Sequence, residues 1–280
     1  YAFECGQQSC TACGDFAKVP QRIRYRHVSL PVKVSFLNRV IYNKWATQII
    51  TTGDCISKPL INDLKINPEK VHTIPTGVDP PADLIDREKA RIRLCQELTL
   101  PTHCRFIGQV SVLRNWKGQD DVMEGFDQVA DDWPDVHLVF VGGGHGERYL
   151  PPIAKSKKHA DRIHFVGHQS DPWPYFRALD VNLLASIAGE GIPQVGMQSM
   201  LSGTPFIGTK VGGIPEIVTD GKTGLLVEPK NPKQIGEALR RCFNEDGLMA
   251  HLSVEALKWA RENCSIALMG SRVAEVFERQ

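Results

Sequence analysis

The stretch AGEGIPQVGMQSMLSGTPFIGTKVGGIPEIV, residues 188–218, carries the strongest signal in the chain. Within it, Gly191, Ile192 and Pro193 form a turn that leads into a predicted helix over 193–201. A helix that starts after such a turn presents free backbone N–H groups and the positive end of its dipole, which together favour an anion such as phosphate. We therefore expect these three residues to lie against a phosphorylated ligand.

Two polar side chains flank this predicted anion site. Glu190 directly precedes the turn, and an acidic side chain there accepts hydrogen bonds from sugar hydroxyls. Gln198 follows eight residues later, which the pattern places about two turns along the same helix. It would then reach a neighbouring part of the same ligand. The segment predicts a site for a phosphorylated sugar.

A second cluster of polar residues lies in QVSVLRNWKG, residues 109–118, where a predicted strand leads into a helix. Arg114 and Lys117 are three positions apart at this junction, so we expect both to point at one phosphate group. Two cations beside helix N–H donors suit a diphosphate leaving group. The sequence contains no D-x-D pair. This agrees with chemistry that needs no metal, and we expect no cofactor besides the substrate itself.

Short apolar runs alternate with amphipathic stretches along most of the chain. Several runs are apolar on both faces, which is typical of parallel strands covered by helices on both sides. This alternation predicts a doubly wound α/β architecture. The predicted strands are 22–26, 48–52, 71–74, 105–110, 136–141, 162–166, 181–184 and 205–209, and the predicted helices include 117–130, 149–159, 193–201 and 232–243.

A run of prolines and glycine over 75–81 interrupts any regular element and predicts a domain boundary. We expect a partial Rossmann-like domain over 1–79, with too few elements to cover a sheet on both faces. A complete Rossmann-like domain is expected over 80–265, and it contains both segments of the expected sugar and phosphate site. Residues 266–280 are expected to form a helix that packs back toward the first domain.

The composition is that of an ordinary globular protein. Of 280 residues, 42% are hydrophobic and 23% are charged, and the net charge is +1. This length suffices for two α/β domains, and the near-neutral charge indicates no nucleic-acid partner. No stretch reaches the roughly 18 apolar residues of a membrane span. The chain begins with Tyr1 rather than Met and shows no secretory signal, so we expect a fragment of a cytoplasmic protein.

The cysteines favour a protein with reduced thiols. Cys5, Cys10 and Cys13 have the C-x4-C-x2-C spacing of three ligands in a plant-type 2Fe–2S loop. The fourth ligand is absent at the expected distance, because the next cysteine, Cys55, lies too far along the chain. A thiol-rich terminus is therefore favoured over a metal or cluster site, and the second interpretation stays open. The other cysteines are scattered singly, which argues against a disulfide framework.

The segments 188–218 and 109–118 resemble the glycosyltransferases group 1, or family 4, which have the GT-B fold. The match is closer to members that read EGIPQxxxQxM, often polysaccharide transferases of the cell envelope. The resemblance implies that Glu190 contacts the donor sugar and that Gln198, where the family usually has Glu, holds the ribose. It also implies that Lys117 and a nearby arginine neutralise the diphosphate in place of a metal; Arg114 is our candidate, although the family's arginine usually lies earlier.

Less specific matches extend the resemblance from about residue 22 to beyond residue 227. FVGHQSDPWPYFRALDVNLLAS places Val166, Gly167 and His168 where the family's backbone meets the nucleotide base. RYRHVS places His27 near the donor sugar. The implied function is transfer of a sugar, with retention, from a nucleotide diphosphate to a glycan or lipid-linked acceptor.

Three other functions were weighed. The glycine run VGGGHGE, residues 141–147, resembles a dinucleotide loop but has Glu147 where the third glycine belongs, which argues against a nicotinamide enzyme. A non-catalytic nucleotide-sugar-binding fragment and a GT-B sugar-nucleotide epimerase both stay open.

The segment 16–53 contains basic residues and no acidic one. It is either a basic face packed inside a two-domain cleft, a solvated helix, or a surface for an anionic partner, which would be a lipid-linked acceptor or the inner leaflet. Val32, Phe36, Val40 and Trp45 give the expected helix here an apolar stripe, which suits a membrane surface and a packed core alike. The basic residues are Lys18, Arg22, Arg24, Arg26, Lys33, Arg39 and Lys44.

Overall fold

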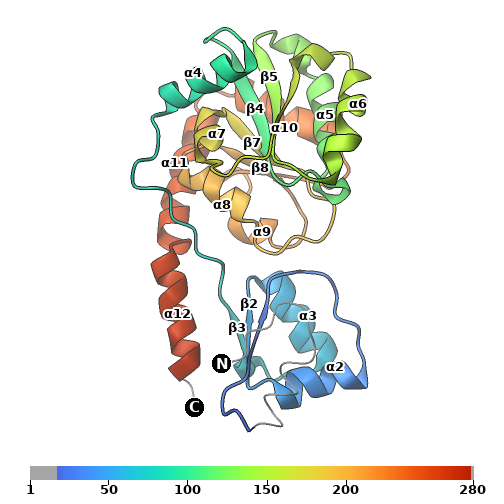
Figure 1. The fold of residues 1–280 in the computed structure, drawn as a ribbon, viewed down its shortest axis with the longest axis vertical. Coiled ribbons are helices and arrows are strands. Elements are labelled where there is room, and N and C mark those ends of the chain that lie inside the picture. Colours follow the sequence, from blue (N-terminus) through green and yellow to red (C-terminus); the bar gives the residue numbers. More distant parts are fainter. Residues whose placement is uncertain (1–17, 279–280) are drawn as a thin grey trace.

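The computed structural model describes residues 18–278, which form two lobes joined by a linker and a long C-terminal helix (Figure 1). Each lobe contains one parallel sheet. The doubly wound α/β class expected from the alternating pattern is therefore confirmed.

The smaller lobe contains a three-stranded sheet in the order β1-β2-β3. Its core is formed by apolar side chains of the strands and of α3, with Ile49, Ile56 and Leu60 all buried. The short helix α2 continues directly into a π-helix over Ile41–Trp45. The elements are β1 (Ile23–Arg26), α2 (Phe36–Val40), β2 (Gln48–Thr51), α3 (Asp54–Leu64) and β3 (Val71–Thr73).

The larger lobe contains a six-stranded sheet in the order β6-β5-β4-β7-β8-β9. All six residues of β5 are buried, because helices cover this sheet on both faces. The strands are β4 (Arg105–Val110), β5 (Val136–Val141), β6 (Ile163–Gly167), β7 (Val181–Leu184), β8 (Phe206–Thr209) and β9 (Leu225–Val227).

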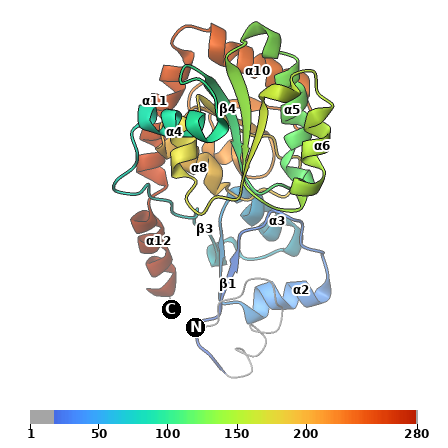
Figure 2. The ribbon, with the colours of Figure 1, turned by 45° about the horizontal axis from the view of Figure 1, so that its top comes forward.

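Two groups of helices cover the two faces of this sheet (Figure 2). On one face α5 (Gln119–Asp127), α6 (Leu150–Lys155) and α10 (Pro232–Asn244) share a core with the strands. The other face is covered by α4 (Arg87–Leu98), α7 (Trp173–Ala178), α8 (Gln194–Leu201), α9 (Ile214–Ile217) and α11 (Leu248–Asn263).

The last helix, α12 (Ile266–Glu278), leaves the larger lobe and packs on the sheet of the smaller one (Figure 1). Val276 is buried among Ile23, Ile50 and Ile74 of the smaller lobe. The amide of Gln21 donates a hydrogen bond to the carbonyl of Phe277 at 2.6 Å. The C-terminal residues therefore belong structurally to the smaller lobe.

The chain passes between the lobes twice, and the two passages touch. The backbone N–H of Val78 donates to the carbonyl of Cys264 at 2.6 Å. Gly77 lies so close to Ile266 that a Cβ at Gly77 would be 2.5 Å from its Cα. Only a residue without a side chain fits at this position.

Several element boundaries differ from the sequence prediction. Strand β9 was not expected, because its three residues are too short for a clear pattern. The helix expected over 117–130 is broken: α5 covers only its middle, since Gly118 has a left-handed conformation at φ 66°. The helix expected over 149–159 ends at Lys155.

The apolar stripe expected on one helix near residues 32–45 is also wrong. Helix α2 covers only Phe36–Val40, so Val32 and Trp45 lie outside it, and the side chain of Phe36 is 85% exposed. Cys5, Cys10 and Cys13 lie outside the described residues. The cysteines within them, Cys55, Cys95, Cys104, Cys242 and Cys264, are free thiols. None of the helices over residues 18–278 combines the length and apolar character that crossing a membrane requires.

Candidate functional site

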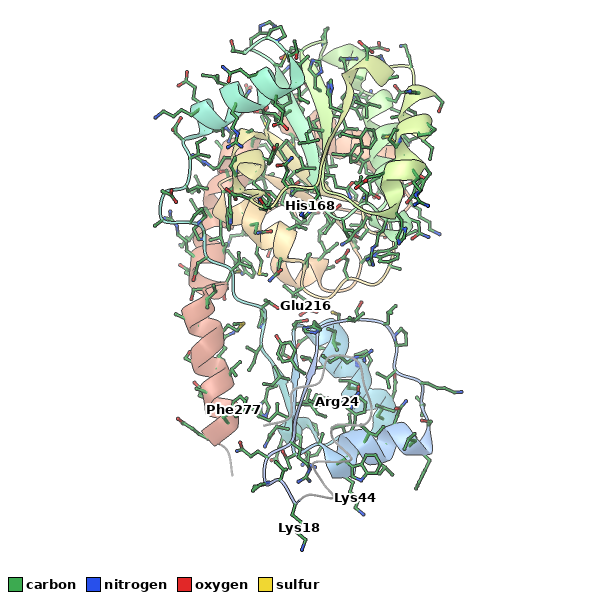
Figure 3. The ribbon with its side chains drawn as sticks, viewed as in Figure 1. Lys18, Arg24, Lys44, His168, Glu216 and Phe277 are labelled. Atoms are coloured by element: carbon green, nitrogen blue, oxygen red, sulfur yellow. The ribbon has the colours of Figure 1, made fainter. Side chains whose placement is uncertain are left out.

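The loops that carry most of the expected site residues meet at the carboxyl ends of β4, β7 and β8. These strands are neighbours in the sheet, although β4 and β7 are far apart in sequence. The loops lie on the side of the larger lobe that faces the smaller one (Figure 3). In open parallel sheets this edge is where ligands bind.

The centre of the site is a buried ion pair. Glu190, only 6% exposed, accepts hydrogen bonds at Oε1 from the ammonium of Lys117 and from the hydroxyl of Ser186, the latter at 2.5 Å. Each charge is stabilised by the other, since an isolated buried charge is strongly unfavourable. The structure thus joins Lys117 and Glu190, which the sequence had placed in separate motifs. Ser186 was missed, because a lone serine after a strand carries no signal.

Close backbone packing holds the three loops together. Gly118 has φ 66°, and a Cβ there would lie 2.0 Å from the carbonyl oxygen of Ala185. Gly212 has φ 55°, and a Cβ there would lie 1.9 Å from the carbonyl oxygen of Glu190. Both positions therefore require glycine, for conformation and for space.

Gln109 positions the loop that carries Lys117. Its side chain is fully buried, and its Nε2 donates to the carbonyl of Lys117 at 2.8 Å. Within the described residues its Oε1 has no hydrogen-bond partner. The sequence analysis quoted Gln109 as the start of the motif but gave it no role.

The turn before α8 lies between the lobes. Ile192 and Pro193 are buried, and Pro193 is the N-cap of α8. A Cβ on Gly191 would approach the carbonyl oxygen of His27 to 2.4 Å. The backbone of His27, just after β1, is thereby next to the donor-site turn. Its ring is exposed and lies edge-on to Tyr25, with 4.9 Å between centroids.

Glu190 precedes the helix that carries Gln198, as expected from the sequence. Glu190 lies in the loop after β7, because the turn at 191–193 separates it from α8. Gln198 is half-buried in the second turn of α8. Among the described residues, its amide group has no hydrogen-bond partner, so it is available to a ligand.

Arg114 and Lys117 point to different environments. Arg114 has an extended backbone conformation and lies before the short turn Asn115–Lys117. Its guanidinium stacks over the exposed ring of Trp116, 4.9 Å from the centroid. With His145 and Tyr149, these residues line an open hollow of about 470 Å³. The structure therefore does not bring Arg114 into the ion pair of Lys117.

The expected base-binding residues lie at the end of β6. Gly167 has φ 82°, and its carbonyl accepts from the N–H of Gly142 at 2.9 Å. His168 is exposed, and Val166 is half-buried. The glycine run after β5 packs on the loop after β4, since a Cβ on Gly142 would lie 2.0 Å from the carbonyl of Ser111.

The chain is similar to several known proteins. The family model "Glycosyl transferases group 1" matches residues 88–259. The D-inositol 3-phosphate glycosyltransferase of Corynebacterium glutamicum is 28% identical over 214 residues, covering 72% of this chain and 50% of that protein. The lipopolysaccharide core biosynthesis mannosyltransferase LpsB of Rhizobium meliloti is 27% identical over 206 residues, covering 71% of this chain and 56% of that protein.

The chain thus spans about half the length of the curated relatives it matches. Among solved structures, Anabaena HepE in complex with UDP superposes with a TM-score of 0.85 at 20% identity, covering 98% of this chain and 77% of that chain. This likeness agrees with two Rossmann-like lobes of the GT-B type. Because the family model matches well over half of the residues, this chain belongs to the glycosyl transferases group 1 family.

Proposed function

We propose that this chain carries the donor site of a glycosyltransferase that moves a sugar from a nucleoside diphosphate to an acceptor. The observation that carries the proposal is the buried pair of Lys117 and Glu190 beside the N-terminus of α8. The pair combines a cation for a phosphate with a carboxylate for sugar hydroxyls.

The same pair supports a mechanism without a metal. As the glycosidic bond breaks, negative charge grows on the leaving diphosphate, and the ammonium of Lys117 stabilises it together with helix N–H groups. Glu190 would then accept hydrogen bonds from the sugar, while the hydroxyl of Ser186 still donates to its Oε1. We further propose that the anomeric configuration is retained, with the acceptor attacking from the side of the departing diphosphate.

The nucleotide is proposed to lie across the same edge of the sheet. Gln198 would bond the ribose, and the backbone over 166–168 would meet the base. Anabaena HepE, whose fold superposes on this chain, binds UDP. The guanidinium of Arg114 lies over the ring of Trp116. From there it is proposed to contact the outer side of the phosphates or a neighbouring part of the substrate.

For the acceptor we propose a glycan or a lipid-linked sugar in polysaccharide synthesis, at a cytoplasmic membrane face. LpsB, a relative, is named for lipopolysaccharide core synthesis. Lys18, Arg24 and Lys44 lie on the smaller lobe, away from the larger one (Figure 3). The same lobe exposes the apolar side chains of Leu30, Val34, Phe36 and Leu37. Cosedimentation with phosphatidylglycerol vesicles, against neutral phosphatidylcholine vesicles, tests this peripheral association.

The direct test of the donor site is calorimetric titration with UDP, GDP and ADP. Lys117→Met is expected to weaken the preferred nucleotide by roughly tenfold or more, since hydrogen bonds to charged groups contribute about 1.5–3 kcal/mol. Lys233→Met, on an exposed lysine of α10, is the matched control and should bind as the wild type. In Lys117→Met the carboxylate of Glu190 has lost its cation. The double variant Lys117→Met/Glu190→Gln removes this unpaired charge and so controls for its effect on nucleotide affinity.

Wild-type affinity in both Lys117 variants would rule out the phosphate assignment. Binding is expected to survive EDTA, and a loss that magnesium restores would contradict the metal-free mechanism. Incubating the protein with the nucleotide sugar and no acceptor distinguishes a transferase from an epimerase. An isomerised sugar would identify an epimerase instead.

A further inference from the structure

The two lobes are joined by a carboxylate from the larger lobe that caps a helix of the smaller one. Glu216 of α9 accepts a hydrogen bond from the backbone N–H of Asp54 at 2.7 Å and from that of Cys55 at 2.6 Å. Each carboxylate oxygen takes one of these bonds. Asp54 and Cys55 are the first two residues of α3. Figure 3 shows Glu216 between the lobes.

The N-terminus of α3 depends on this carboxylate. The N-cap residue is Gly53, which has no side chain to accept the first N–H groups of the helix. A side chain there would be crowded, because a Cβ would lie 3.0 Å from Ile192 and 3.1 Å from Glu216 itself. The helix therefore receives its cap from the other lobe. The negative charge also suits the positive end of the helix dipole.

This contact lies away from the two passages of the chain between the lobes. The linker and the start of α12 run along one side of the molecule, whereas α3 and α9 meet toward the other side (Figures 1 and 2). A bond in that position restrains rotation of the lobes about the two passages. Bonds near the passages restrain it less, because they lie close to the axis.

The same contact is tied to the donor site. A Cβ on Gly213, just before α9, would lie 2.7 Å from the carbonyl oxygen of Gly191. On its other side, Gly191 packs against the carbonyl of His27. Holding Glu216 on α3 thus keeps the turn at Gly191 pressed between the two lobes.

We propose that Glu216 is a positioning residue that clasps the lobes together, so that groups of the smaller lobe lie beside the donor sugar. Its effect on sugar transfer rests on the proposed function. The clasp itself does not, because it can be measured without a substrate.

Cys55 provides a native reporter of the clasp. Its thiol is half-buried between the lobes, with Sγ 4.0 Å from the carbonyl oxygen of Glu190. Burial, together with the charge of Glu216, raises the pKa of this thiol to about 12. Separation of the lobes would expose the thiol to a reagent.

The experiment measures the rate at which N-ethylmaleimide labels Cys55, read by peptide mass spectrometry, in wild type, Glu216→Ala and Glu216→Gln. Both substitutions remove the same charge, so both change the thiol pKa alike. Only glutamine keeps an oxygen that can accept an N–H of α3. Glu228→Ala is the control, because Glu228 is another exposed carboxylate of the larger lobe, paired with Lys210.

We expect Glu216→Ala to label at least about threefold faster than Glu216→Gln, the range of one neutral hydrogen bond. Glu228→Ala should label as the wild type. Equal rates in the alanine and glutamine variants would overturn the clasp. If both rates match the wild type, Glu216 does not restrain the lobes; if both exceed it equally, loss of the charge alone accounts for the result.

A second measurement tests the positioning role in the complete enzyme. Glu216→Ala is expected to lower kcat for sugar transfer while the affinity for the nucleoside diphosphate stays within about twofold, because the larger lobe holds the nucleotide. Unchanged kcat together with faster Cys55 labelling would overturn the positioning role. If instead no nucleotide binds to the wild type, the proposed function fails, and the labelling result still decides the clasp.

Discussion

At the scale of single residues, the site depends on two charges that are buried only as a pair. Lys117 and Glu190 come from loops after different strands, and their side chains are 13% and 9% exposed. Such a pair is weak evidence for stability, since both charges lose hydration. We propose that the pair serves ligand binding, in which each charge exchanges its partner for a group of the substrate.

Gln198 provides a residue-scale prediction about the ribose. A carboxylate accepts two hydrogen bonds from a diol, and charge-assisted bonds are about twice as strong as neutral ones. We expect Gln198→Glu to retain or tighten nucleoside diphosphate binding and Gln198→Ala to weaken it several-fold. Gln194→Ala, on an exposed residue of the same helix, is the control.

The measurement is the affinity for the ribonucleoside diphosphate relative to its 2′-deoxy and 3′-deoxy forms. Wild type should discriminate against the deoxy forms, and Gln198→Ala should not. Equal discrimination by the two proteins would show that Gln198 does not contact the ribose.

At the scale of elements, the loops after β4, β7 and β8 form one unit through backbone contacts. Gly118 and Gly212 allow these contacts, because each has a positive φ and no side chain. The strands carry the loops to a common edge, and the glycines bring them within van der Waals distance. The position and the spacing of the site side chains therefore follow from the strand order and from these two glycines.

Gly212 tests this interpretation against a matched glycine. Both Gly212→Ala and Gly221→Ala carry the strain of an alanine with positive φ, roughly 1–2 kcal/mol of unfolding free energy. Only at Gly212 would the new Cβ strike the backbone of Glu190, since a Cβ at Gly221 would meet no described atom within 4 Å. We expect Gly212→Ala alone to lose nucleotide affinity in calorimetry. Equal affinity in both variants would contradict the packing argument.

A second element-scale prediction concerns the buried His137 of β5 and its neighbour on β6, the half-buried His164. Nδ1 of His137 lies 2.9 Å from Nε2 of His164. Burial, with the nearby charges of His164 and Arg162, lowers the pKa of His137 to about 4. In the unfolded chain the pKa returns to about 6.5, so the unfolded state binds the extra proton first. The contribution of neutral His137 is therefore complete above pH 6.5 and is lost as the pH falls toward 4.

The unfolding free energy of the wild type is expected to fall between pH 7 and pH 5. In His137→Asn this fall is expected to be smaller by about 1–2 kcal/mol. Urea denaturation at the two pH values measures it. His251→Asn, on an exposed histidine of α11, should keep the wild-type difference. A wild-type difference in His137→Asn would exclude this histidine as the cause.

At the scale of the whole molecule, the C-terminal helix unites the two lobes. Helix α12 begins beside Gly77 and completes the core of the smaller sheet with Val276. Within residues 18–278 the smaller lobe contains three strands, and α12 covers apolar side chains that the helices of this lobe leave open. Loss of this packing is therefore expected to destabilise that lobe first.

Val276→Ala tests this dependence. Removing two buried carbons is expected to lower the unfolding free energy by roughly 1–3 kcal/mol. Val254→Ala, at a 64% exposed position of α11, should change it by less than about 0.5 kcal/mol. Urea denaturation followed by circular dichroism compares the two. Similar small effects of both substitutions would mean that α12 contributes little to the stability of the lobe.

The sequence alone was sufficient for the fold class, most strands of both sheets and the family. These features are local: a strand buried on both faces must be apolar throughout, and glycine must stand where a helix begins after a tight turn. Glu190 and Lys117 were identified as candidates for the same reason, because each lies in a motif with a clear junction.

Only the tertiary structure paired these residues with their partners. The sheet order places β4 beside β7, which brings Lys117 onto Glu190 and leaves Arg114 over Trp116. Similarly, Glu216 meets α3 only because the lobes face each other. Local patterns report which face of an element is buried. They do not report which distant element covers it, because that depends on how whole sheets and lobes pack.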